Sequence, residues 1–224
     1  MLPGLRQADH PATADQPGLL GVAHCLPLCG ACEVSKIGMR LPGAPARAPR
    51  QLGLHERSVP ADAAEIRSDT GELFRSLASR YGLIDSPRTK AAYGFLGAAG
   101  WLQLKGLRLR CRTDFAVIAL SSLTDEPLDR SDNILLTAVG RADNSGAVYN
   151  ANHTLQYERG HAPILAEVIE TDIELETTVT GLTVSGINTE GMICGPVAAT
   201  LAEGRLRFAL GGDFPSIYYL IQKV

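Results

Sequence analysis

The chain has 224 residues, of which 45% are hydrophobic and 20% are charged, and its formal net charge is −3. These proportions are ordinary for a globular protein and supply enough apolar material for a core. A slightly acidic chain without a basic stripe argues against nucleic acid or an anionic membrane as a partner. The sequence contains no apolar run of 18 residues and no acceptable signal peptide, so we expect a soluble, cytoplasmic chain.

Residues 1–64 are rich in proline, glycine and alanine, and no helical or strand period persists there. We therefore expect a low-order, mostly disordered tail. Cys25, Cys29 and Cys32 lie in this tail at a spacing similar to the radical-SAM motif, which holds a four-iron cluster. Ala31 stands where that family usually has an aromatic residue, and no barrel follows. We interpret the cysteines as incidental, rather than as a cluster or zinc site, and expect no metal and no cofactor.

From residue 65 the sequence is typical of β-strands. Residues 107–112 alternate apolar side chains with arginines, while residues 115–120 and 134–139 are continuous apolar runs. Such runs are typical of central strands that are buried on both faces. Further strands are expected at residues 164–169, 172–179, 182–187, 206–210 and 217–222.

Turn residues such as glycine, aspartate and asparagine separate these runs. The pattern predicts an all-β domain over residues 65–224, an antiparallel β-sandwich of jelly-roll-like type. The only helices expected are short, at residues 61–66 and 88–93. There is no repeating βαβ pattern, so a TIM barrel or a Rossmann fold does not fit in this chain.

Four carboxylates crowd one predicted strand, at Glu170, Asp172, Glu174 and Glu176. At a period of two residues they share one face of the strand. Glycoside hydrolysis needs two carboxyl groups in different environments, one of which stays protonated. A row of equivalent acids offers no such asymmetry. We therefore interpret the row as a solvated outer face and assign no catalytic residue.

Three aromatic residues are candidates for a sugar platform. Trp101 is the single tryptophan, and Tyr149 and Tyr157 lie in a polar segment. Sugar-binding modules place exposed aromatic rings against the apolar faces of pyranose rings. The alternative for each residue is a partly buried ring at the end of a strand.

From residue 68 onward the sequence resembles the C-terminal region of large bacterial glycoside hydrolases that carry a TIM-barrel catalytic domain upstream. The most specific segment runs from Leu135 to Gly146 and reads LLTAVGRADNSG. The segments that carry the resemblance are residues 69–73, 84–89, 94–97, 115–123, 135–146 and 162–165.

In such enzymes the β-sandwich packs on the barrel, and the catalytic glutamates lie on barrel strands. No segment of this chain matches those strands, so no catalytic residue is transferred. The resemblance implies a non-catalytic accessory domain in a truncated fragment, with a glycoside hydrolase barrel or a homo-oligomer as partner, and carbohydrate as a further ligand. The alternative function is an autonomous carbohydrate-binding module.

Within the resembling segments, four residues have structural roles that can be predicted. Arg141 and Asp143 follow a predicted buried strand and are expected to pair across its turn. Asp85 is expected to cap a turn through its side chain. Arg88 is expected to bind a carboxylate through two hydrogen bonds.

Overall fold

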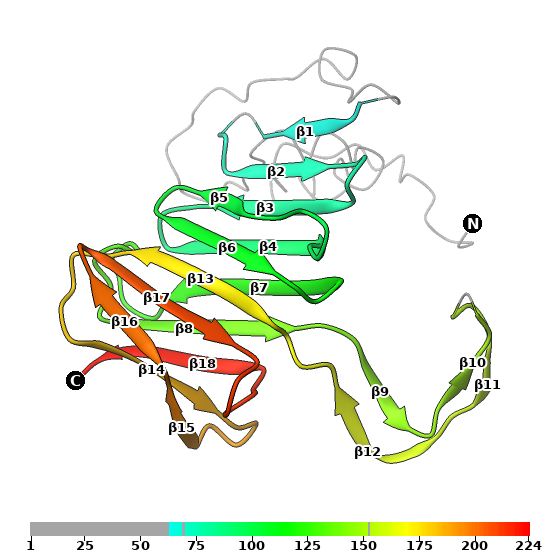
Figure 1. Cartoon of the computed structure of the whole chain (residues 1–224). Helices are drawn as coiled ribbons and strands as arrows, with labels where there is room; N and C mark the ends of the chain where they lie inside the picture. The colour runs from blue at the N-terminus through cyan, green and yellow to red at the C-terminus, as the bar shows by residue number, and fades with distance from the viewer. Residues whose placement is uncertain (1–62, 69, 152) are drawn as a thin grey trace, which may run out of the picture. The chain divides into compact units, whose positions relative to one another are not determined.

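The computed structural model describes residues 63–68, 70–151 and 153–224, and within these ranges the chain contains strands and no helix (Figure 1). The chain divides into two compact units, Met1–Ala78 and Ser79–Val224. In the first unit, β1 (Glu65–Arg67) and β2 (Leu73–Ser76) form an antiparallel hairpin. The expected disordered tail and its three cysteines fall almost entirely in residues 1–62, outside the described residues.

The second unit is a β-sandwich of two antiparallel sheets, which confirms the predicted fold class. The large sheet has the strand order β3-β4-β7-β8-β18-β14-β15, and the five-stranded sheet has the order β16-β17-β13-β6-β5. The large sheet comprises β3 (Tyr81–Asp85), β4 (Thr89–Phe95), β7 (Phe115–Ser122), β8 (Asn133–Val139), β14 (Leu182–Ile187), β15 (Ile193–Val197) and β18 (Tyr218–Lys223). The five-stranded sheet comprises β5 (Leu102–Leu104), β6 (Leu107–Cys111), β13 (Thr171–Glu176), β16 (Ala199–Ala202) and β17 (Arg205–Leu210).

The core lies between the two sheets and is built from alternate residues of each strand. Successive side chains of a strand point to opposite faces, so every second position can be apolar and buried. The buried positions of the central strands include Ile118, Leu120, Ile134 and Leu136 from the large sheet, and Leu107, Leu109, Ile173, Leu175 and Leu206 from the five-stranded sheet.

The short helix expected at residues 88–93 is wrong, because this segment is strand β4. It pairs along its whole length with β7, from Thr89 opposite Ser121 to Phe95 opposite Phe115. Pairing with neighbouring strands buries the apolar side chains of this segment, which a short isolated helix could not do. The second expected helix, at residues 61–66, is also not seen where the structure describes it, since Glu65–Arg67 is a strand.

Asp85 connects the two sheets rather than capping its own turn. Its side chain forms an ion pair with Lys90, whose side chain is 8% exposed, and its second oxygen accepts a hydrogen bond from the Lys105 amide at 2.8 Å. Lys105 lies in the turn between β5 and β6, in the opposite sheet. The turn after Asp85 is instead closed by the Ser86 hydroxyl, which donates to the Thr89 carbonyl.

The other two expected pairings also differ. Arg88 binds Asp125 through one nitrogen at 3.1 Å, and its other nitrogen donates to the carbonyl of Thr124. Arg141 pairs with Asp114 at 3.4 Å and not with Asp143. These partners lie on segments that are distant in the sequence, and local spacing could not identify them.

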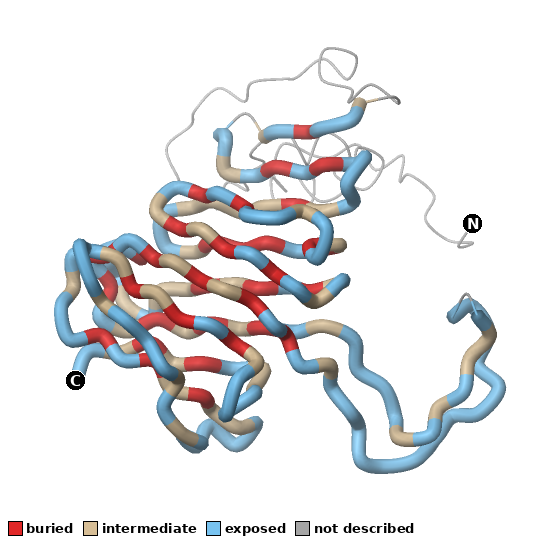
Figure 2. Tube along the Cα trace, viewed as in Figure 1, coloured by how far each residue is buried: buried red, intermediate tan, exposed pale blue. Residues whose placement is uncertain are grey.

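Between β8 and β13 the chain leaves the sandwich and forms a long arm, which we define as residues 140–168 (Figure 1). Its strands are β9 (Ala142–Ser145), β10 (Val148–Tyr149), β11 (Gln156–Glu158) and β12 (His161–Ala166). They form two separate two-stranded sheets, β9 with β12 and β10 with β11. Figure 2 shows that the arm is mostly exposed, and every residue of β12 is exposed.

The arm can be removed without cutting into the core. At its base, the Glu167 amide donates to the Arg141 carbonyl at 2.8 Å, so these two residues already face each other across a strand pair. None of the described residues in 142–151 and 153–166 belongs to the core. We predict that replacing residues 142–166 with Asn-Gly, a two-residue hairpin turn, changes the free energy of unfolding by less than about 1 kcal/mol.

Urea denaturation followed by circular dichroism measures this change. Ile118→Ala serves as the sensitivity control, because this residue is fully buried and its truncation is expected to cost about 2–4 kcal/mol. A truncated protein that loses its cooperative transition would show that the arm is part of the folded core.

Candidate functional site

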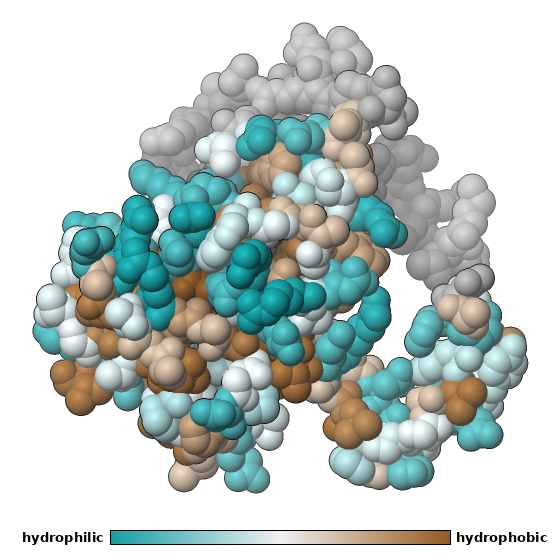
Figure 3. Space-filling model, viewed as in Figure 1, coloured by the Kyte–Doolittle hydropathy of each residue, from teal (hydrophilic) through white to brown (hydrophobic). Residues whose placement is uncertain are grey.

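The outer face of the five-stranded sheet carries a ladder of opposite charges. We call this the charge ladder; its members are Arg108, Arg110, Arg112, Glu170, Asp172, Glu174, Glu176, Arg205 and Arg207. The acids of β13 lie between arginines of β6 on one side and of β17 on the other. Hydrophilic side chains gather over these strands in Figure 3, as the predicted solvated face requires.

Each acid of the ladder has at least one arginine partner. Arg110 contacts Asp172 at 2.9 Å and Arg112 contacts the same carboxylate at 2.6 Å. Glu174 lies 3.4 Å from Arg108, and Glu176 lies 3.0 Å from Arg205. The arginines therefore balance the acids along the row.

The direction in which the pKa of Asp172 is shifted shows whether this carboxyl group could act as a general acid. Burial alone would raise the pKa of Asp172, but hydrogen bonds from Arg112 and Arg110 outweigh it and hold the pKa below its ordinary value. A general acid needs the opposite shift, toward a carboxyl group that stays protonated. Asp172 is therefore suited to a structural ion pair and unsuited to proton donation.

The structure does not gather the three candidate sugar platforms into one site. Trp101 precedes β5 in the five-stranded sheet, whereas Tyr149 and Tyr157 lie on β10 and β11 of the arm, which projects away from the sandwich (Figure 1). The Trp101 ring has the guanidinium groups of Arg108 and Arg110 at 4.7 and 5.2 Å from its centroid. Arginines of the charge ladder thus already contact this ring.

The two tyrosines of the arm differ in their surroundings. The Tyr149 ring stacks on His153 with centroids 5.1 Å apart, and its hydroxyl donates to Asp143 at 2.8 Å. Tyr157 is 64% exposed. Tyr149 is therefore engaged within its own hairpin, while Tyr157 presents a largely open ring.

The outer face of the large sheet differs sharply from the charge ladder. Along β4, β7, β8 and β18, the residues that alternate with the core positions include no charged side chain. We call this the uncharged face; its members are Thr89, Ala91, Tyr93, Phe95, Phe115, Val117, Ala119, Ser121, Asn133, Leu135, Thr137, Val139, Tyr218, Leu220 and Gln222. Tyr93, Val117, Val139 and Tyr218 are its most exposed apolar members, each between 36% and 41% exposed.

The register places these side chains in cross-strand rows. Tyr93, Val117 and Val139 are directly opposite one another on β4, β7 and β8. Phe95 faces Phe115 with ring centroids 5.5 Å apart in an edge-to-face arrangement. The exposed apolar residues are therefore neighbours and form a continuous patch.

An antiparallel sheet with one wet face normally alternates apolar and polar residues. The runs at residues 115–120 and 134–139 break this rule, and on that basis we predicted strands buried on both faces. In the described chain, one face of each strand packs in the core and the other belongs to the uncharged face. Contiguous exposed apolar surface is a common feature of interaction sites in proteins.

The remaining chemical groups are few. No group of three or more histidine, cysteine, aspartate or glutamate side chains could hold a metal ion within residues 63–68, 70–151 and 153–224. Cys111 is a buried free thiol whose pKa is raised by burial, whereas Cys194 is a free thiol exposed on β15. The described part of the chain also has no helix that could cross a membrane.

Comparisons with protein-family models, with curated proteins and with solved structures give no match to this chain. The candidate surfaces are therefore assigned from geometry and sequence alone. They are the charge ladder, the uncharged face and the arm. Among these, the uncharged face exposes neighbouring apolar side chains to water.

We predict that Asp172→Asn destabilises the protein at neutral pH and that this loss disappears in acid. The pKa of Asp172 is depressed in the folded state, so its stabilisation is present above the ordinary value of 3.8 and is lost as the pH falls through the folded value. Urea midpoints of both proteins, measured between neutral pH and about pH 2, should therefore converge. A difference that persists at the lowest pH would show that the substitution acts through packing rather than charge.

Proposed function

We propose that this chain is a non-catalytic accessory domain of a bacterial glycoside hydrolase, and that it docks onto the catalytic barrel of its parent enzyme. The observation that carries the proposal is the uncharged face of the large sheet. Opposite-facing residues of the same strands form the core of the sandwich, so β7 and β8 are apolar on the inner side and uncharged, with several apolar side chains, on the outer side. A partner domain on the second side would remove that apolar surface from water.

The location of the resembling segments supports this proposal. Residues 115–123 coincide with β7, and residues 135–146 span most of β8 and all of β9. Residues 162–165 lie on β12, which pairs with β9 in the arm. The most specific parts of the resemblance therefore lie on the uncharged face and the arm, and not on the charge ladder.

The arm supports docking for an independent reason. A two-stranded ribbon without a packed face is at best marginally stable in water. Yet the arm exposes several large apolar side chains, among them Tyr157 at 64%, Ile164 at 70% and Leu165 at 58%. A second surface that covers these side chains would stabilise the arm. The arm therefore extends the docking surface beyond the sandwich.

The charge ladder supports the non-catalytic part of the proposal. Its four carboxylates are the most concentrated acids of the described chain, and each is paired with arginine. A glycosidase pair needs one carboxyl group that is kept protonated and one that is ionised. In the ladder, hydrogen bonds from Arg112 and Arg110 hold the pKa of Asp172 below its ordinary value, which is the opposite of what a proton donor needs.

The proposal predicts that a neighbouring reading frame encodes a TIM-barrel catalytic domain, and it is tested with that barrel and the purified chain. We expect the chain alone to show no hydrolysis of 4-nitrophenyl glycosides, and to form a one-to-one complex with the barrel in size-exclusion chromatography with light scattering. Val117→Lys should weaken this complex at least about 30-fold, because it buries an unpaired charge at the centre of the uncharged face.

Thr200→Lys is the matched control, because it adds the same charge to an exposed position on the five-stranded sheet. This variant should bind the barrel like the unaltered chain. Intrinsic turnover by the chain, or a complex that tolerates Val117→Lys, would contradict the proposal. A homodimer that Val117→Lys dissociates would identify a second copy as the occupant of the uncharged face and would equally contradict docking on a barrel.

A further inference from the structure

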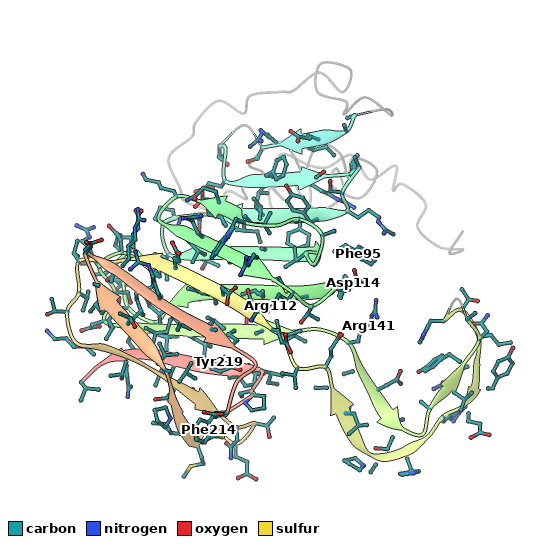
Figure 4. All side chains as sticks on the ribbon, viewed as in Figure 1. Phe95, Arg112, Asp114, Arg141, Phe214 and Tyr219 are labelled. Atoms are coloured by element: carbon teal, nitrogen blue, oxygen red, sulfur yellow. The ribbon has the colours of Figure 1, made fainter. Side chains whose placement is uncertain are left out.

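A hollow of about 440 Å³ lies at one end of the sandwich, away from the residues that define the uncharged face. Its walls come from the end of β15, the end of β17, the loop between β17 and β18, and the residues that flank β6 and β13. Figure 4 labels Arg112, Phe214 and Tyr219, which line it together with Glu170, Pro196 and Gly211.

The Phe214 ring is held at the hollow by two glycines. Gly186 and Gly195 lie directly opposite each other on β14 and β15. A Cβ atom at Gly195 would come within 2.4 Å of the Phe214 ring, and one at Gly186 would lie 3.2 Å from the Phe214 carbonyl oxygen. The absence of side chains at this pair therefore makes room for the ring, which remains 36% exposed.

The polar side of the hollow is formed by Arg112 and Glu170, and both side chains are held in place by their neighbours. Arg112 lies 3.5 Å from Glu170 and 2.6 Å from Asp172, so its guanidinium is oriented by the charge ladder. Gly211 has a φ of +89°, and a Cβ atom there would lie 2.9 Å from the Glu170 side chain. The loop thus approaches Glu170 closely at a position that requires glycine.

Tyr219 adds a buried hydroxyl group to the lining. This residue is 1% exposed, and its hydroxyl oxygen accepts a hydrogen bond from the Ser216 amide at 2.9 Å. Burial raises the pKa of the Tyr219 hydroxyl, and hydrogen bonds from the backbone of Ser216 and Gly211 oppose that rise. Tyr219 is therefore tied to the loop between β17 and β18 that forms one wall of the hollow.

We infer that this hollow binds a neutral sugar ring. The exposed Phe214 ring offers an apolar surface for one face of a pyranose. Arg112 and Glu170 offer a donor and an acceptor side by side, which matches neighbouring hydroxyl groups that both donate and accept. A charged ligand fits less well, because the single guanidinium is already balanced by Asp172 and Glu170.

This inference goes beyond docking, because it gives the accessory domain a glycan contact of its own. It does not depend on the catalytic barrel and is measured on the isolated chain. It also differs from the expected platforms at Trp101, Tyr149 and Tyr157, none of which lines the hollow.

The test is an NMR titration of the ¹⁵N-labelled full chain with D-glucose, D-galactose, D-mannose, D-xylose and L-arabinose. Concentrations up to about 100 mM are needed, because a single ring is expected to bind in the millimolar range. We expect at least one sugar to shift the amide signals of Gly211, Gly212 and Phe214 saturably. Phe214→Ala should weaken that binding about tenfold.

Glu170→Gln is a second variant that leaves the Phe214 ring in place, and it should weaken binding several-fold. Trp101→Ala, the control at an expected platform, should leave the affinity unchanged. The inference is overturned if no sugar gives saturable shifts in the unaltered chain, if binding survives Phe214→Ala and Glu170→Gln, or if Trp101→Ala abolishes it.

Discussion

The constraint that governs this domain is that β4, β7, β8 and β18 pack one face in the core and carry no charged side chain on the other. The inner face is satisfied by packing against the five-stranded sheet, where residues such as Ile118 and Leu136 are fully buried. The outer face has no equivalent partner within the described part of the second unit, and it includes no charged side chain. Burial of apolar surface is the dominant favourable contribution to both folding and association. The same strands that hold the sandwich together therefore also supply its strongest tendency to associate.

The outer face of the five-stranded sheet is charged. The lack of charged side chains is therefore a property of the large sheet and not of both sheets. The charge ladder covers the five-stranded sheet with alternating arginines and acids, each acid within contact of a guanidinium. Such a face is well solvated and gains little from being covered, since exposed ion pairs contribute modestly. The sandwich thus has one charged face and one uncharged face that we propose is covered by a partner. The hollow at Phe214 adds a third surface, for which we propose a small neutral ligand.

The sequence predicts the fold class well, because alternation and turn residues are local signals. The prediction that residues 115–120 and 134–139 are buried on both faces is wrong for the described chain, because Val117 and Val139 are exposed on the outer face; the apolar runs nevertheless fall on strands of the uncharged face. The charge ladder is predicted only in part: the acids of β13 and the arginines of β6 are each visible as rows, but their contact depends on which strands are neighbours. The hollow escapes prediction entirely, because Arg112, Glu170 and Phe214 are far apart in the sequence and only the fold brings them together. The expected helix at residues 88–93 fails for the same reason, since tertiary pairing decides its conformation.

The central claim, that the uncharged face is covered by the parent enzyme's catalytic domain, is tested most directly by hydroxyl-radical footprinting with mass spectrometry. Tyr93 and Tyr218 are exposed aromatic reporters on the uncharged face, and Trp101 is an exposed reporter beside the charge ladder. The account predicts that adding the catalytic domain lowers the oxidation of Tyr93 and Tyr218 and leaves that of Trp101 unchanged. Protection of Trp101 with no protection of the two tyrosines would contradict it.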